Sequence, residues 1–446
     1  MKRIIALLLI LSVLLISLLG MVSCVETKPD TDGEQGQTPG GDQENGENNT
    51  DGDNNQGSKD ECADDSHIDA NNDDYCDSCS KYVVVVVDFY VLNDLHGKFC
   101  DTDSQAGVDE LATYLKKMKA TDDNAIFLAS GDMWQGSSES NLTKGYVITE
   151  WMNHLNFAAM TLGNHEYDWG ETYIENNATL AGFPFLAINI YDRETNERVD
   201  YCRSSVLVQR GGARIGIIGA VGDCYSSISG EMSGDFYFKT GRELTDLVKS
   251  EAMALREAGA DFIVYSVHDG HGSSSSGSIS DSSLSAYYDP ILSEGYVDIV
   301  FEGHTHQRYV LTDGDGVYHL QGGGDNKGIT HAEATINFAN GKSQVTTAEL
   351  ISSTAYAHLP DDPIVETLKE KYRDQISAGD AVLGYNDSYR SGDYLRQLVA
   401  DLYAKVGEEA FPDYDVRRAF TAQIIIDHVE SDTGRHIDNF EEAMDK

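Results

Sequence analysis

The sequence predicts a layered α/β fold in which strands and helices alternate along one large domain. Val83–Leu92 is a dense run of β-branched and aromatic residues, typical of a strand buried on both faces of a parallel sheet. From this run to about residue 340, short apolar runs alternate with segments of helical periodicity. Polar clusters directly follow several of these runs, and ligands of open α/β sheets bind just beyond the carboxyl ends of the strands. We therefore expect one functional site at the carboxyl edge of the sheet.

The individual elements follow from the same periodicities. Strands are predicted at residues 83–92, 124–129, 158–162, 185–190, 213–221, 262–267, 297–301, 317–321 and 330–338. Helices are predicted at residues 108–119, 147–155, 243–258, 363–375 and 394–406.

The composition limits the partners of the chain. Its 446 residues are enough for two or three domains with a large core. The 75 acidic residues outnumber the 32 Lys and Arg residues, which gives a formal net charge of -43. No basic patch is evident, so we expect no binding to a nucleic-acid polymer. The sequence names no protein partner.

The first 24 residues have the pattern of a signal peptide. The basic start Met1–Arg3 is followed by the apolar segment Ile4–Leu19 and then by small residues before Cys24. This ending resembles a bacterial lipoprotein signal, although Met21 stands where Leu is more usual. The resemblance implies that Cys24 is lipidated and that the protein is anchored to the outer face of the membrane. Plain secretion and a retained membrane anchor remain as alternatives.

Residues 25–60 are predicted to be a disordered acidic linker, because they contain almost no apolar residues. Residues 61–82 differ and are predicted to be a small module. Its C-x4-H-x8-C-x2-C pattern is formed by Cys62, His67, Cys76 and Cys79. Sulfur and imidazole ligands at this spacing favour a zinc site.

Two alternatives to zinc remain open for this module. Asp69, Asn71 and Asp73 have the spacing of a calcium loop, although Asp74 replaces the expected Gly. A disulfide-stapled acidic turn would also suit an exported chain.

Five polar clusters follow successive predicted strands. They are Asp94-Leu95-His96, Gly131-Asp132, Gly163-Asn164-His165-Glu166, His268 and Gly303-His304-Thr305-His306. A single histidine after a strand is more often a capping or solvated residue than a ligand, but five such clusters in order predict a metal site. Because residues i and i+2 of an extended chain point the same way, we expect Asp94 and His96 to face one point.

Taken with their neighbours, these clusters resemble the motifs of the calcineurin-like metallophosphoesterases. Within that superfamily they are most similar to the bacterial 5'-nucleotidases and UDP-sugar hydrolases, because of the extensions Trp134-Gln135-Gly136 and Glu166-Tyr167-Asp168. The resemblance implies a sandwich of two mixed β-sheets flanked by helices at residues 83–355. It also implies two divalent ions of Mn, Zn, Fe or Co.

The resemblance assigns a role to each site residue. The first ion would be held by Asp94, His96, Asp132 and His306, and the second by Asp132, Asn164, His268 and His304. His165 would stabilise the leaving group and Asp168 would orient it, although Asp168 would also suit a turn or a helix cap.

The implied activity is hydrolysis of phosphate esters, with extracellular nucleotides as the expected substrates. A 2',3'-cyclic-nucleotide phosphodiesterase or a nucleotide-sugar diphosphate hydrolase would use the same core. A non-catalytic surface-binding lipoprotein is the alternative from another class.

Residues 356–446 resemble the nucleotidase C-terminal α/β domain only in part. Ser391–Asp401 is similar to its first helix, after a linker helix, but no Asn-Gly-Gly-type segment with a following Arg is found after Asp401. We therefore expect an incomplete second domain, either truncated or reduced in this lineage, and a weaker or broader nucleotide preference.

Overall fold

The computed structural model describes residues 68–377, except residues 72, 74, 101–105, 231, 272–276 and 279–293. The predicted signal peptide with Cys24, the acidic linker, Cys62 and His67 lie outside the described residues, as do the helix at 394–406 and most of the C-terminal segment. Among the described residues, no helix combines the length and the apolar character needed to cross a membrane.

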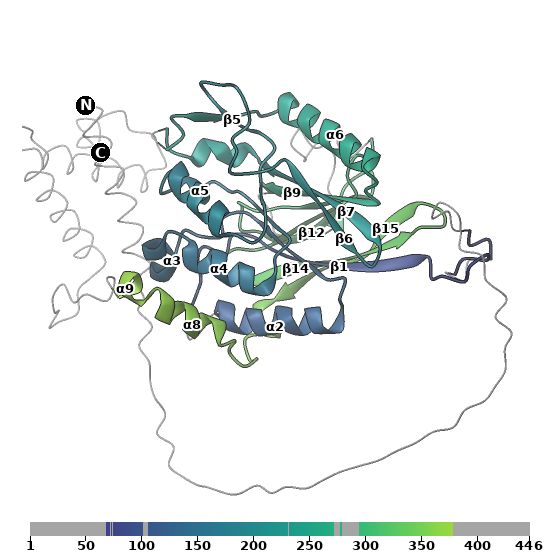
Figure 1. Ribbon diagram of the computed structural model, residues 1–446, viewed down its shortest axis with the longest axis horizontal. Coiled ribbons are helices and arrows are strands. Elements are labelled where there is room, and N and C mark those ends of the chain that lie inside the picture. The colour runs from purple at the N-terminus through teal and green to yellow at the C-terminus, as the bar shows by residue number, and fades with distance from the viewer. Residues whose placement is uncertain are drawn as a thin grey trace, which may run out of the picture. The chain divides into compact units, whose positions relative to one another are not determined.

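Two mixed sheets form the centre of the domain (Figure 1). The first has six strands in the order β15 (Lys342–Ser352), β14 (Gly328–Asn337), β1 (Val84–Leu92), β2 (Ile126–Ser130), β3 (Ala159–Thr161) and β4 (Phe185–Leu186). The second has seven in the order β10 (Gly277–Ser278), β12 (Arg308–Thr312), β13 (Tyr318–Gly322), β11 (Ile299–Phe301), β9 (Phe262–His268), β7 (Ala213–Val221) and β6 (Ser205–Arg210). A separate two-stranded sheet pairs β5 (Ile190–Asp192) with β8 (Phe236–Phe238).

The valine-rich strand β1 lies in the middle of the first sheet. It pairs parallel with β2 and antiparallel with β14, so its environment is mixed rather than the parallel sheet of which its valine run is typical. One face of β1 packs against the second sheet, where the Phe89 ring lies 5.8 Å from Phe262 and 6.0 Å from Phe301. The predicted sandwich of two mixed sheets is thereby confirmed.

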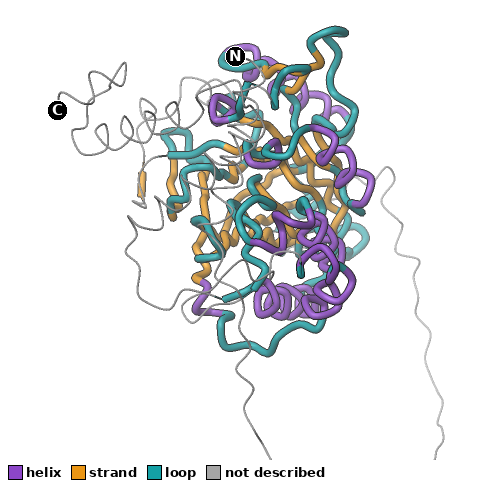
Figure 2. The backbone as a smooth tube through the Cα atoms, turned by 90° about the vertical axis from the view of Figure 1, so that its left-hand side faces the viewer, coloured by secondary structure: helices purple, strands orange, loops and turns teal. Residues whose placement is uncertain are grey.

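Helices cover the outer faces of the two sheets (Figure 2). The helices are α2 (Val108–Thr121), α3 (Ser138–Thr143), α4 (Tyr146–Leu155), α5 (Glu171–Leu180), α6 (Arg242–Glu257), α8 (Ile364–Lys371) and α9 (Arg373–Ile376). Leu111 of α2 and Trp151 of α4 share a core with Phe127 of the first sheet. Val248 of α6 packs with Ile218 and Ile263 of the second sheet.

Several elements differ from the sequence prediction. The strand predicted at 185–190 is divided into β4 and β5, because Asn189 leaves the first sheet and hydrogen-bonds both backbone groups of Val221. The helix predicted at 363–375 is interrupted at Tyr372. Strands β6 and β15 were not predicted, since they lie at sheet edges and carry few continuous apolar residues.

The described part of the small module, residues 68–82, packs at the amino end of β1. Buried Cys76 forms a small apolar cluster with Val83 and Val84, and Phe338 N–H donates to the Val83 carbonyl. The module therefore lies at the end of β1 opposite its carboxyl end.

Candidate active site

The fold brings the five predicted clusters to one edge. The parallel strands β1, β2 and β3 are each followed by predicted ligands. Asp94 and His96 follow β1, Asp132 follows β2, and Asn164 follows β3. Parallel strands β9 and β11 of the other sheet end at His268 and just before His304 and His306. Since the two sheets pack face to face, the carboxyl ends of both sets of strands meet there.

One group of ligand atoms is formed by Asp94, His96 and His306. Their ligand atoms all lie within 4.8 Å of one another. His96 Nε2 is 2.9 Å from His306 Nε2, and Asp94 Oδ1 is 3.3 Å from the same His306 nitrogen. The Gln135 carbonyl lies 2.9 Å from His96 Nδ1, which directs His96 Nε2 toward the group.

A second group surrounds Asp132. Asp132 Oδ2 lies 2.9 Å from His268 Nε2, and Asp94 Oδ1 lies 3.9 Å from that nitrogen. His268 Nδ1 lies 2.7 Å from the Ser130 carbonyl, which fixes the ring with Nε2 inward. His304 Nδ1 lies 3.0 Å from Asn164 Oδ1. Short contacts therefore link Asp94, His96, His306, Asp132 and His268, and the His304 ring of the Asn164 pair lies 5.5 Å from the His268 ring between centroids.

Charge within this site opposes the effect of burial on Asp132. Burial alone would raise the pKa of its carboxyl group, but His268, with His165 and His96 nearby, holds the pKa below its usual range. Asp132 is therefore an anion at the centre of the site.

The backbone at this edge is unusual. Asp94, His96, Asp132, His304 and His306 all have positive φ angles between 49° and 69°. This conformation costs non-glycine residues about 1–3 kcal/mol each and is concentrated at functional sites. The expectation that Asp94 and His96 converge through extended geometry is therefore wrong, because left-handed backbone turns position both side chains.

Buried Glu166 supports these turns. Its carboxylate accepts hydrogen bonds from the backbone N–H groups of Asp132 at 2.9 Å, Met133 at 2.8 Å and Gly163 at 2.7 Å. Burial, with the nearby charge of Asp132, raises the pKa of Glu166 to about 7 against these hydrogen bonds. Glu166 thus joins the loops that follow β2 and β3.

His165 and Asp168 form a pair beside the ligand groups. His165 Nδ1 lies 2.8 Å from Asp168 Oδ2, and the His165 backbone N–H donates to Asp132 Oδ1 at 2.8 Å. Burial would lower the pKa of His165, but the Asp168 hydrogen bond and the Asp132 charge raise it to about 9. The His165 side chain is 33% exposed, so solvent reaches it while its ring is held in place.

A family model described as calcineurin-like phosphoesterase matches residues 87–308. Residues 87–308 form a calcineurin-like phosphoesterase domain. Among solved structures, the calcineurin-like phosphoesterase YfkN of Bacillus subtilis is similar with a TM-score of 0.56 at 17% identity, covering 67% of this chain and 100% of that one. A putative 5'-nucleotidase of Staphylococcus aureus gives 0.53 at 19% identity, covering 65% and 58%. At such identities these structures support the fold.

Curated relatives of the phosphoesterase domain include an apyrase of Tabanus yao, 32% identical over 229 residues. A 5'-nucleotidase of Vibrio vulnificus is 27% identical over 225 residues. Each match covers 48% of this chain, and the chain spans only 38% and 39% of the two relatives.

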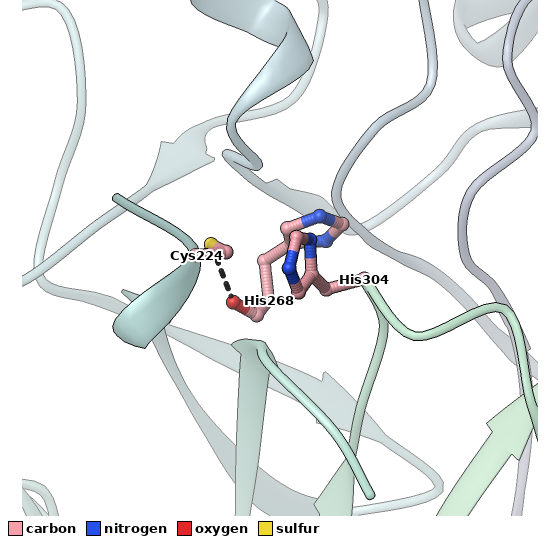
Figure 3. Close-up of side chains that lie close together, drawn as sticks. All are labelled: Cys224, His268 and His304. Carbon is pink, nitrogen blue, oxygen red and sulfur yellow. Dashed lines mark hydrogen bonds between the residues drawn. The ribbon is translucent and has the colours of Figure 1, made fainter. Parts of the chain in front are cut away.

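Sequence reasoning missed Cys224 as a neighbour of the phosphoesterase site. Cys224 Sγ, His268 and His304 offer ligand atoms within 4.8 Å of one another. Figure 3 shows the Cys224 sulfur directed at the His268 backbone carbonyl, to which it donates at 2.9 Å, with the imidazole rings on the other side. Burial raises the pKa of this thiol well above its usual value. No local motif distinguished this cysteine, because only the fold places η3 (Asp223–Ser227) beside β9.

Asn93 is a further residue whose role the sequence did not reveal. Its side chain donates to Asp94 Oδ2 at 2.6 Å and to the Gly323 carbonyl at 2.9 Å, and it accepts from Gly322 N–H at 2.9 Å. Asn93 therefore fixes the Asp94 carboxylate against the end of β13.

Only part of the predicted module outside the phosphoesterase domain is described. Asp69 and Asn71 both accept a hydrogen bond from the Asp73 backbone N–H at 3.0 Å. Cys76 is buried and Cys79 partly buried. These contacts form an acidic turn that is compatible with each of the three interpretations.

Proposed function

We propose that the phosphoesterase domain is a two-metal hydrolase of phosphate esters and that nucleotides are its substrates. The observation that supports this most strongly is the convergence of seven ligand-type side chains from five strand ends beside the His165–Asp168 pair. In this proposal Asp94, His96, Asp132 and His306 would hold the first ion. Asp132, Asn164, His268 and His304 would hold the second, so that Asp132 would be shared by both.

The donor set suits divalent transition metals. His96 and His306 direct two ring nitrogens at each other at 2.9 Å, so both nitrogens face a point where one ion could be bound. His268 Nε2 is fully buried and makes no hydrogen bond of acceptable geometry, although Asp132 is close. Mixed imidazole, carboxylate and amide donors favour Mn, Zn, Fe or Co over Mg.

When bound, two such ions would supply charge neutralisation of the phosphate and activation of a water for in-line attack. The chain itself supplies the remaining functions. In this proposal His165 would hold or donate a proton near the leaving oxygen. Its 2.8 Å contact with Asp168, which fixes the tautomer and favours the cationic form, supports this role. Glu166 and Asn93 hold the turns that carry Asp132 and Asp94.

The names of the curated relatives, apyrase and 5'-nucleotidase, support a nucleotide substrate. The N-terminal sequence supports export and lipid anchoring through Cys24. An enzyme anchored there would act on nucleotides outside the cell. In the native host, Cys24→Ala should move the protein from the membrane fraction to the soluble fraction. Unchanged fractionation would rule out the lipid anchor.

The test of function is turnover of a substrate panel by the full chain in Mn²⁺. The panel comprises AMP, 2',3'-cyclic AMP, UDP-glucose and an aryl phosphate, with phosphate release as the readout after phosphomonoesterase coupling where needed. Hydrolysis of AMP that Asp132→Asn abolishes in a folded variant is the expected result. Lack of turnover on every ester, with metal bound, would favour the surface-binding alternative.

A further inference from the structure

A second cluster of imidazole and carboxylate groups lies apart from the seven proposed ligands. His271, Glu302 and His319 offer ligand atoms that all lie within 4.8 Å of one another. They come from the segment after β9, the end of β11 and the middle of β13, which are neighbouring strands of the second sheet. We propose that these three residues bind a further divalent ion, of the zinc class, independently of the two-metal centre.

Glu302 is the anionic member of this cluster. Its side chain is 0% exposed, and Oε2 accepts a hydrogen bond from the Tyr309 hydroxyl at 2.6 Å. Its other oxygen, Oε1, lies 3.1 Å from His319 Nδ1 and 3.8 Å from His271 Nε2. A buried carboxylate thus directs one oxygen at two imidazole nitrogens, as a His₂Glu metal site requires.

His271 provides the second observation that indicates a ligand. Its Nε2 atom is buried and makes no hydrogen bond, yet it faces Glu302. Its ring is held by contacts with Tyr309 at 5.6 Å and with His319 at 5.9 Å between centroids. Buried polar nitrogens are normally satisfied, and a cation between His271 and Glu302 would satisfy this one.

Asp313 lies next to the His319 ring nitrogen that does not face Glu302. Asp313 Oδ2 lies 3.6 Å from His319 Nε2, while Asp313 Oδ1 is held by the backbone N–H groups of Asp315 and Val317. Metal-binding histidines commonly direct their second ring nitrogen at a carboxylate, which fixes the tautomer. The competing arrangement is a cationic His319 held between two acids. That arrangement explains Asp313 but leaves His271 Nε2 without a role.

Two imidazoles and one carboxylate are the protein ligands of many zinc sites. The ion would tie the segment after β9 to the loop between β11 and β12. The Thr305 hydroxyl already donates to the His271 carbonyl at 2.8 Å, and Thr305 lies between His304 and His306. The additional ion would therefore stabilise the loop on which two proposed active-site ligands lie.

The test is metal content of the full chain, measured by inductively coupled plasma mass spectrometry after loading with Zn²⁺ and removal of free metal. Wild type, His271→Gln, His319→Gln and Asp132→Asn are compared, and His271→Gln and His319→Gln are each also placed in the Asp132→Asn background. His331→Gln is the matched control, because His331 is likewise held between two carboxylates, Asp88 and Glu349, but has no second imidazole. Circular dichroism verifies folding.

We expect His271→Gln and His319→Gln each to lose about one zinc per chain in both backgrounds, while His331→Gln loses none. Substituting Co²⁺ should give a visible absorption band in Asp132→Asn that His271→Gln removes. Wild-type zinc content in folded His271→Gln would overturn the proposal. If His319→Gln does not fold, the zinc content of His271→Gln alone decides the outcome, because His271 is partly exposed and its substitution should be tolerated. Failure of the two-metal proposal would appear differently, as unchanged metal content in Asp132→Asn.

Discussion

The seven proposed active-site ligands and the cluster of His271, Glu302 and His319 contain similar side chains but differ in backbone conformation. Five of the seven proposed active-site ligands have positive φ angles, whereas His271, Glu302 and His319 have none. The first cluster depends on strained turns held by Glu166 and Asn93. The second combines His319 within β13, Glu302 directly after β11 and His271 in the segment after β9. If both proposals hold, strained and externally supported turns position the reactive ligands, whereas the stabilising ion needs no such strain.

The largest expected effect separates the two clusters directly. Asp132→Asn removes the charge shared by both ligand groups and should reduce phosphate-ester turnover by about 1,000-fold or more, since bound ions contribute several kcal/mol to such reactions. His271→Gln should retain most of the turnover. Steady-state kinetics on both variants measure the contrast, and equal losses would remove the distinction between an active site and a stabilising site.

Asp168→Asn tests whether the His165 pair belongs to the reactive cluster. The imidazole would lose its charged partner, so kcat should fall by about 100-fold while KM changes little. Asp235→Asn, an exposed acid elsewhere, is the control. A change in KM alone would assign Asp168 to substrate binding.

Glu166→Gln tests the support of the strained turns. An amide has one acceptor oxygen and would direct its NH₂ group at backbone N–H donors, so metal affinity of the two-metal centre should fall by about 10- to 100-fold. Excess Mn²⁺ should restore turnover. The exposed Glu257→Gln should behave as wild type. Lost activity that metal does not restore would contradict a supporting role.

The smallest expected effect is on protein stability and concerns His331 on β14. Hydrogen bonds to two carboxylates account for the position of its imidazole without a metal ion. Its ring stacks on Tyr90 at 4.7 Å and lies 2.5 Å from Asp88 and 2.9 Å from Glu349. Burial opposes the charged form, but the two acids raise the pKa of His331 above its ordinary value of 6.5.

Because the folded-state pKa is raised, this stabilisation is fully present below pH 6.5 and is lost as pH rises through the folded-state pKa. The free energy of unfolding of His331→Gln should therefore lie about 1 kcal/mol below wild type at pH 5.5, and the difference should narrow at high pH. Urea titrations at several pH values measure it. A difference independent of pH would show that packing, rather than charge, is lost.

The sequence predicted the α/β sandwich and the candidate ligands, which the structure brings to one edge of the sheets. Apolar runs such as β1 and β9 are buried throughout most of their length, and a polar residue at the end of each run marks the edge where the ligands meet. The family resemblance also predicted that Asp168 orients His165, and the structure has a 2.8 Å contact between the two side chains.

Other features depend on contacts between segments far apart in the chain. Cys224 and His319 have no neighbouring motif, and they acquire their surroundings only when β7, β9, β11 and β13 align. The positive φ of Asp94 and His96 arises from hydrogen bonds to the loop after β2, which local periodicity does not encode. Edge strand β15 is half solvated, so hydrophobic pattern alone does not reveal it.

Residues 68–82 lie far from the edge of the sheets where substrate would bind. The nine residues of β1 separate this module from Asp94, and an extended strand of that length spans about 30 Å. Residues 68–82 thus lie one strand length away from the edge where the proposed ligands meet. A partner that bound residues 68–82 would therefore leave the ligand edge of the sheets open to substrate.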